Sequence, residues 1–377
     1  MFRIMHLADL HLGWEPRFMP GERAAERRRR RDRLLARAVE YALRPENRVG
    51  LVVIAGDLFE SHRPEPALVQ EVIGQLRRLE EARIPVVTVP GNHDEITYHD
   101  SVYRQYAGQW PGILVRNPLP DHVTTVEVGG LPVHVYSLAY TGGVTPAHAP
   151  LTRFPRLDEP GFHLAAFHGT LGDWGGDRSL PLDRDALGRA GYDYVALGHI
   201  HQALEERPGG TPVVYAGAVE GKGFDDPGVG CWTLVEAGPG GVRVIREPVA
   251  VQPIRSLRLD AGAYPDLDAL AADLAGRGDP DLILQVRLEG APSFRPDPER
   301  LQVLCGSRFF YLEVEDGTEV VTTEQLARWA AEPTILGQFV RRMRTRLEEA
   351  ADERQRRIAA RALRLGLHAL MREGGAG

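Results

Sequence analysis

Five short apolar segments in the first part of the chain each lead directly into side chains that can bind a metal ion. Runs of this length, bounded by glycine and polar residues, are typical of buried β-strands. In chain order the segments and their polar endings are Phe2–Leu7 with Asp9 and His11, Leu51–Ala55 with Asp57, Pro85–Val89 with Asn92, His93 and Asp94, Phe162–Phe167 with His168, and Tyr194–Leu197 with His199 and His201. If these five strand ends meet at one place, their Asp, His and Asn side chains form a single cluster there.

The spacing and chemistry of these residues favour metal ligation. In Asp9-Leu10-His11 and His199-Ile200-His201 the outer side chains face the same side of an extended segment, because side chains alternate along it. Mixed Asp, His and Asn ligands without cysteine suit Mn²⁺, Fe²⁺ or Zn²⁺ in hydrolytic sites. The five endings contain nine Asp, His and Asn residues, and about seven ligands are too many for one catalytic ion but suit two ions that share a carboxylate. Two ions about 3.5–4 Å apart can hold both oxygens of a phosphoryl displacement, so the pattern predicts phosphate ester hydrolysis.

Each polar ending taken alone also has a structural explanation. A Gly-Asp pair after a strand, or a lone histidine, is usually structural, whereas Gly91-Asn92-His93-Asp94 is more specific. All five endings in order, each closing a strand, are not expected by chance. His6, His134 and His163 lie inside strand patterns, where a histidine of the core or of a sheet face is the expected role.

Composition limits the class of protein. Hydrophobic residues make up 43% and charged residues 26% of the chain, which is ordinary for a globular protein. A net charge of −7 argues against a protein that coats DNA, and the arginine-rich stretch Glu22–Arg37 is interpreted as a solvated helix face. Two isolated cysteines, no signal peptide and no long apolar span predict a cytoplasmic protein with no membrane association.

The order of predicted elements indicates an α/β protein. The helices Arg23–Leu43 and Pro66–Ala82 complete a β-α-β-α-β opening, which is followed by mostly β sequence up to a boundary near Val251–Ile254. A small α+β region follows, and then helices at Thr323–Ala331, Thr334–Glu349 and Asp352–Met371. The predicted domains are 1–252, 253–318 and 319–377.

The five blocks resemble the calcineurin-like metallophosphoesterase superfamily and, more narrowly, its SbcD-type DNA repair nucleases. The blocks closest to that branch are Asp9-Leu10-His11-Leu12-Gly13, Ala55-Gly56-Asp57-Leu58-Phe59, Pro90-Gly91-Asn92-His93-Asp94 and Leu197-Gly198-His199-Ile200-His201. The resemblance implies a four-layer α/β/β/α sandwich with two Mn²⁺ ions. It also implies a DNA exonuclease or endonuclease of double-strand break repair, with a DNA-capping domain and C-terminal helices that bind an SMC-like (SbcC-type) ATPase.

The resemblance assigns a role to each residue of the site. One ion is expected to take Asp9, His11, Asp57 and His201. The other is expected to take Asp57, Asn92, His168 and His199, so that Asp57 bridges the pair. His93 matches the histidine that contacts the scissile phosphate and helps the leaving group depart. Asp94 is expected to orient His93, as carboxylates beside catalytic histidines commonly do.

One position departs from the branch. Three residues after Asp57, archaeal and eukaryotic nucleases of this family place a second active-site histidine, where this chain has Glu60. Some bacterial relatives also have an acid at that position. The departure leaves the choice between exonuclease and endonuclease open.

Three functions are compatible with these observations. The first is a Mn²⁺-dependent DNA nuclease with an ATPase partner, and the second is the same chemistry on a small substrate such as a cyclic nucleotide. The region beyond the core and its basic helices favour DNA as the substrate. The third is a non-catalytic DNA-binding scaffold, against which the complete ligand set argues. A homodimer through the helix that begins at Arg23 is a further expectation.

Overall fold

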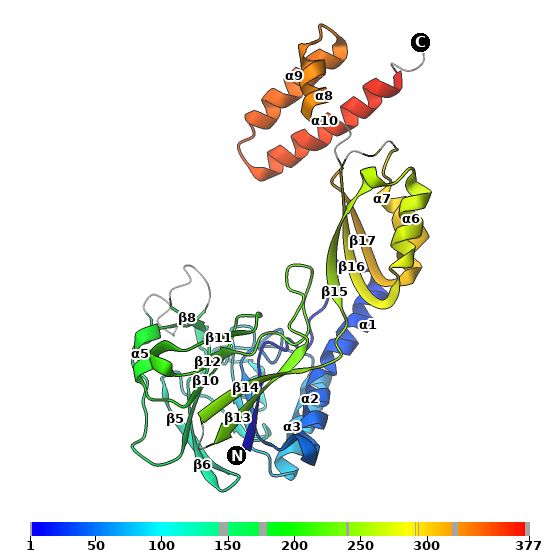
Figure 1. Ribbon diagram of the computed structural model, residues 1–377. Coiled ribbons are helices and arrows are strands. Elements are labelled where there is room, and N and C mark those ends of the chain that lie inside the picture. Colours follow the sequence, from blue (N-terminus) through cyan, green and yellow to red (C-terminus); the bar gives the residue numbers. More distant parts are fainter. Residues whose placement is uncertain are drawn as a thin grey trace. The chain divides into compact units, whose positions relative to one another are not determined.

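The computed structural model describes residues 2–142, 150–172, 179–238, 241–290, 292, 294–318 and 323–373. It divides into two compact units, Met1–Gln252 and Pro253–Gly377. The first unit contains two large sheets, and the second contains a small sheet and the C-terminal helices (Figure 1). The expected mixed α/β fold is confirmed.

The first large sheet is built around the amino-terminal strand. Strand β1 (Phe2–Leu7) pairs in parallel with β2 and antiparallel with β13. Parallel pairing continues from β2 to β3 and from β3 to β4, so the carboxyl ends of β1, β2 and β3 lie at one edge. The other strands of this sheet are β2 (Val49–Ala55), β3 (Val86–Val89), β4 (Ile113–Leu114), β13 (Cys231–Gly238) and β14 (Gly241–Pro248).

The second large sheet has the order β11-β12-β10-β7-β6-β5. Strand β7 (Phe162–His168) pairs in parallel with both β6 and β10, and β10 pairs in parallel with β12. The carboxyl ends of β7 and β10 therefore also share an edge. The remaining strands are β5 (Asp121–Val128), β6 (Leu131–Ser137), β10 (Tyr194–Gly198), β11 (Leu204–Glu206) and β12 (Val213–Tyr215). A short separate pair consists of β8 (Thr170–Leu171) and β9 (Pro181–Leu182).

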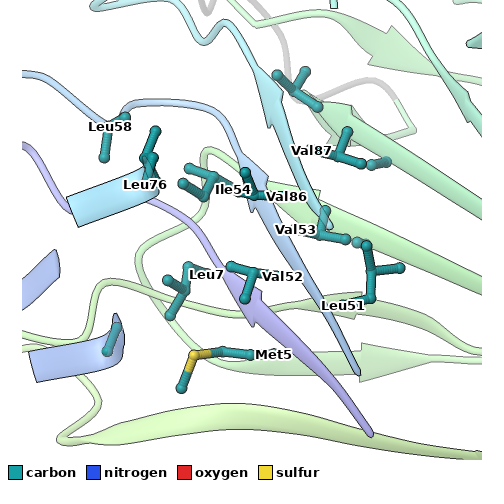
Figure 2. Close-up of a cluster of buried hydrophobic side chains, with 14 of the residues drawn as sticks. Met5, Leu7, Leu51, Val52, Val53, Ile54, Leu58, Leu76, Val86 and Val87 are labelled. Carbon is teal, nitrogen blue, oxygen red and sulfur yellow. The ribbon is translucent and has the colours of Figure 1, made fainter. Parts of the chain in front are cut away.

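The core of the first unit lies on both faces of the first sheet. Along β2, Val52 and Ile54 point to the side of Leu76, while Leu51 and Val53 point to the opposite face (Figure 2). This alternation is the period of a β-strand, and all four side chains are buried. Strand β2 also packs against β7 and β10 of the second sheet, so both its faces are covered. That burial explains why β2 is a continuous apolar run.

Helices cover the outer faces of the two sheets in the first unit. Helices α2 (Leu34–Leu43) and α3 (Pro66–Glu81) pack against each other, and α5 (Arg184–Arg189) lies on the far side of the unit from them (Figure 1). A short helix, α4 (Val102–Gln105), follows the third predicted site segment. This arrangement of helix, sheet, sheet and helix confirms the predicted four layers.

The arginine-rich segment differs from its prediction in two ways. The single expected helix Arg23–Leu43 is divided at Arg33 into α1 (Gly21–Asp32) and α2, of which α1 has a polar sequence and α2 buries an apolar stripe. The solvated-face interpretation is wrong for Arg27 and Arg31, whose side chains are buried against other parts of the first unit.

The second unit begins with a three-stranded parallel sheet. Strand β16 (Asp279–Glu289) lies between β15 (Ile254–Asp260) and β17 (Phe309–Asp316). Helices α6 (Leu267–Gly276) and α7 (Pro298–Cys305) share an apolar cluster with this sheet. Three further helices form a cluster of their own: α8 (Thr323–Ala331), α9 (Ile335–Glu348) and α10 (Glu353–Glu373). Among the described helices, none has the length and apolar character needed to span a membrane.

Candidate metal centre

The predicted site residues meet where the carboxyl ends of both large sheets come together. Asp9 and His11 follow β1, Asp57 follows β2 and Asn92 follows β3 in the first sheet. His168 ends β7 in the second sheet and is in register with Gly198, after which His199 and His201 follow. Two independent sheets thus supply one cluster.

A continuous chain of contacts links all seven predicted ligands. Oδ2 of Asp57 lies 3.6 Å from Nε2 of His11 and 3.4 Å from Nε2 of His168. Oδ1 of Asn92 lies 2.8 Å from Nε2 of His168 and 2.9 Å from Nδ1 of His199. The backbone N–H of His199 donates to Oδ1 of Asp9 at 3.0 Å. Nε2 of His11 lies 3.1 Å from Nε2 of His201, which completes the set.

The donor atoms of this cluster fit a pair of divalent cations. Two imidazole nitrogens that face each other at 3.1 Å have the separation expected of ligands that share an ion, since such bonds are about 2.1 Å long. Three groups of donor atoms are close enough to hold an ion: Asp9 with His11 and His201, His11 with Asp57 and His93, and Asp9 with Asp57 and His168. Asp9, His11 and Asp57 each belong to two of these groups, so a bridging position of Asp57 is compatible with the geometry but is not singled out by it.

Unusual backbone conformations gather at the same residues. Asp9, His11, Asp57 and His199 have positive φ values of 54°, 48°, 50° and 96°. A non-glycine residue in such a conformation costs about 1–3 kcal/mol and persists where the surrounding structure enforces it, often at functional sites. Nearby glycines permit close approach: a Cβ at position 91 would lie 2.2 Å from Oδ1 of Asp57, and one at position 56 would lie 2.1 Å from Nδ1 of His168.

The charges of the cluster are strongly coupled. Burial by itself would raise the pKa of Asp57, but the neighbouring imidazoles of His168 and His11 outweigh it and lower that pKa. Burial would lower the pKa of His168, but the carboxylate of Asp57 raises it to about 9. Burial lowers the pKa of His11 to about 4, against the opposing effect of Glu60. The centre therefore favours an anionic Asp57 and compensating positive charge beside it.

His93 lies at the accessible side of the cluster. Its side chain is 37% exposed, and its backbone N–H donates to Oδ1 of Asp57 at 2.9 Å. Its Nδ1 lies 3.1 Å from the carbonyl oxygen of Glu60. The ring is thus held against the segment after β2, next to the ligands but open to a substrate.

Asp94 does not orient His93 as expected. Its buried carboxylate accepts from the backbone N–H groups of Gly91 at 2.7 Å and Phe59 at 3.1 Å, and from the hydroxyl of Tyr103 at 2.7 Å. Burial, together with the charge of Asp57, raises the pKa of Asp94 to about 6. Asp94 therefore ties the loop after β3 to the loop after β2, while the contact to Nδ1 of His93 comes from the backbone of Glu60.

Three charged residues at the centre were not predicted as part of it. Oε2 of Glu60 lies 2.8 Å from Nδ1 of His11, and Nζ of Lys222 lies 2.6 Å from the same oxygen. Oδ2 of Asp226 lies 2.6 Å from Nδ1 of His201. Glu60 occupies the position at which the resemblance places a second active-site histidine. Lys222, the sole lysine of the chain, was the one signal that could have drawn attention to the segment after β12.

Comparisons with known proteins identify the family of the chain. The family described as calcineurin-like phosphoesterase matches residues 2–203. The uncharacterized metallophosphoesterase YhaO of Bacillus subtilis is 26% identical over 202 residues, which cover 52% of this chain and 47% of YhaO. The DNA double-strand break repair protein Mre11 of Haloferax volcanii is 27% identical over 303 residues, covering 77% of this chain and 62% of that protein.

The matched part of these relatives is limited. The chain spans about half to three fifths of the length of the two curated relatives. Among solved structures, TT1561 of Thermus thermophilus is 13% identical with a TM-score of 0.36, covering 65% of this chain and 98% of that one. The match to Mre11 exceeds the length of the first unit, so the similarity continues into the second.

Proposed function

Because the chain belongs to the calcineurin-like phosphoesterase family, we propose that it is a Mn²⁺-dependent DNA nuclease that hydrolyses phosphodiester bonds with two metal ions. The observation that carries this proposal is the chain of contacts that joins seven Asp, Asn and His side chains from both sheets around Asp57. DNA as the substrate is supported by the similarity to Mre11, which is named as a DNA double-strand break repair protein.

The ligand set divides into two groups that share Asp57. We assign one ion to Asp9, His11, Asp57 and His201. We assign the other to Asp57, Asn92, His168 and His199. When bound, such a pair supplies a nucleophile from water at neutral pH and neutralises charge on the phosphate. The protein's own contribution is to hold the seven donors in place through strained, buried backbone and through packing of the two sheets.

His93 is the proposed acid for the leaving oxygen. In its imidazolium form, Nδ1–H donates to the carbonyl of Glu60, and Nε2–H remains to protonate the departing oxygen. Its backbone contact to Asp57 ties the position of the ring to that of the metal cluster. The side-chain exposure allows a polymer substrate to approach it.

The C-terminal helices of the second unit carry exposed apolar side chains. Ile335 on α9 and Ile358 and Leu365 on α10 are exposed apolar side chains. We propose that α8–α10 dock an SMC-like ATPase and that the small sheet domain caps the DNA. Ile358 and Leu365 lie seven residues apart and therefore share one face of α10, which supports the use of that face for docking. A homodimer also stays a prediction.

The test is hydrolysis by the purified full chain with Mn²⁺. We expect linear DNA to be degraded, degradation to stop with a chelator, and His93→Ala to lose cutting while it retains both ions. Turnover of cyclic nucleotides without action on DNA would favour the small-substrate alternative. DNA binding without hydrolysis of any ester, including a chromogenic one, would favour the scaffold and refute the nuclease.

A further inference from the structure

The segment Glu220–Asp226, between β12 and β13, brings two charged side chains to the candidate metal centre. Oδ2 of Asp226 accepts from Nδ1 of His201 at 2.6 Å. Nζ of Lys222 lies 2.6 Å from Oε2 of Glu60. Neither Asp226 nor Lys222 belongs to the proposed ligand set. Asp226 contacts the proposed ligand His201 directly, whereas Lys222 contacts Glu60, which in turn contacts the proposed ligand His11.

The contact with Asp226 decides which nitrogen of His201 is available as a ligand. An ionised carboxylate only accepts hydrogen bonds, so the hydrogen of a neutral His201 ring is on Nδ1. The lone pair is then on Nε2, the atom that lies 3.1 Å from Nε2 of His11 inside the cluster. A carboxylate on the far nitrogen fixes the tautomer and orientation of a metal-binding histidine in this way.

The segment is itself held in place by helix α1. The guanidinium of Arg31 donates to the carbonyl oxygen of Glu220 at 2.7 Å, and that of Arg27 donates to the carbonyl oxygen of Gly221 at 2.8 Å. Arg27 also forms a buried ion pair with the side chain of Glu220. The ring of Phe224 packs against Phe18, with centroids 5.5 Å apart. The position of Asp226 is therefore set by buried contacts outside the metal cluster.

We propose that Asp226 is a positioning residue that holds His201 in the tautomer and orientation needed to bind one of the two ions. The proposal rests on the proposed two-metal function. A purely structural role for Asp226 in its turn would leave the protonation site of the His201 ring unchanged when the carboxylate is replaced. A positioning role predicts that it changes.

The first measurement reads the tautomer in metal-free protein. Long-range ¹H–¹⁵N spectra of the full chain with ¹⁵N-labelled histidine are recorded at a pH where the ring is neutral, and His201 is assigned by its loss in His201→Gln. We expect hydrogen on Nδ1 in the unchanged protein, and a shift toward hydrogen on Nε2 in Asp226→Asn. Asp225→Asn, which removes the same charge from the neighbouring exposed position, is the matched control and is expected to keep the original tautomer.

The second measurement is a calorimetric titration with Mn²⁺. We expect two ions in the unchanged protein and in Asp225→Asn, and one of the two sites to weaken about 10- to 100-fold in Asp226→Asn. Asp226→Ser serves the same purpose if the Asn variant does not fold. Unchanged tautomer and affinity in a folded Asp226 variant would overturn this proposal alone. Fewer than two ions in the unchanged protein would instead overturn the proposed function.

Discussion

The carboxylate of Asp57, at the end of one sheet, lies 3.4 Å from Nε2 of His168, at the end of the other. This pair joins the two sheets at the candidate metal centre, and each partner shifts the pKa of the other. Asp57 is also the only residue of the proposed ligand set that is assigned to both ions.

We expect Asp57→Asn to disable the centre by removing the shared charge. An amide carries no negative charge to offset two cations, so both ions should bind more weakly and DNA hydrolysis should be lost. Asp121→Asn, at an exposed position that begins β5, should leave both properties unchanged. Calorimetry with Mn²⁺ and a nuclease assay measure the two effects. Two ions bound at unchanged affinity in Asp57→Asn would contradict the bridging role.

The role of His93 as an acid predicts a dependence on the leaving group. His93→Ala should slow hydrolysis of DNA by about 10²–10⁴-fold, because an alkoxide leaves poorly without a proton. A bis(p-nitrophenyl) phosphate ester has a leaving group that needs no proton, so its hydrolysis should fall much less. Steady-state kinetics on both substrates measure the difference. Equal losses on both would indicate that His93 acts on the phosphate or on the ions instead.

Gly91 is expected to tolerate no side chain. A Cβ there would meet Oδ1 of Asp57 at 2.2 Å and the backbone nitrogen of Asp57 at 2.4 Å, so Gly91→Ala should displace the proposed bridge and weaken metal binding. Gly74→Ala, in α3 with no atom within 4 Å of the new Cβ, should bind metal normally and gain up to about 1 kcal/mol of stability. Calorimetry and thermal unfolding of both variants provide the comparison, and normal metal binding by Gly91→Ala would contradict the close approach.

Arg27 forms a buried ion pair with Glu220, so its replacement should destabilise the protein more than the replacement of an exposed arginine on the same helix. Arg27→Met leaves the buried carboxylate of Glu220 without its charged partner and should lower the free energy of unfolding by about 3–5 kcal/mol. Adding Glu220→Gln should recover part of this loss. Arg29→Met, on the same helix but with an exposed partner in Glu26, should change it by less than about 1 kcal/mol. Denaturant unfolding measures all four proteins, and equal costs for the two arginines would refute the prediction.

The histidine of strand β1 makes the stability of the fold depend on pH. Burial, with a smaller contribution from Arg246, lowers the pKa of His6 to about 3, and Nδ1 lies 2.9 Å from the hydroxyl of Tyr194. Between that value and the unfolded pKa of about 6.5 the unfolded chain binds the extra proton, so stability falls as the pH falls. The loss between pH 7 and pH 5 should be about 2 kcal/mol. In His6→Asn this loss in the free energy of unfolding between pH 7 and pH 5 should be smaller by about 2 kcal/mol, as measured by denaturant unfolding in the presence of a chelator. The same loss in both proteins would exclude His6 as the cause of the pH dependence.

The strands and ligands that were predicted from the sequence are those whose signal is local. Strand β2 is buried on both faces, and its residues from Leu51 to Ala55 read as a continuous apolar run. Strands β1 and β7 are mostly apolar, although Arg3 and His6 interrupt the first and His163 interrupts the second. Strand β14 was missed because it lies at a sheet edge and contains Arg243 and Arg246, which interrupt an apolar pattern. The division of the helix at Arg33 was missed because arginine is a good helix former.

The parts of the centre that were missed depend on contacts between distant residues. Asp226 sits in a Gly-Phe-Asp-Asp-Pro-Gly stretch that reads as an ordinary turn, and only the fold places it beside His201. Lys222 meets Glu60 in the same way. The neighbourhood of Asp94 could not be predicted either, because Tyr103 reaches it from a separate helix.

The pairing of β1 with both β2 and β13 has a consequence for how the protein is made. A ribosome releases Asp9 and His11 early, but β13 follows His199 and His201 in the chain and completes the neighbourhood of β1 only after them. A nascent polypeptide therefore carries four of the seven proposed ligands, Asp9, His11, Asp57 and Asn92, before the three from the second sheet are made. The complete proposed ligand set therefore exists only late in the translation of this unit, after His201 and β13 have been made.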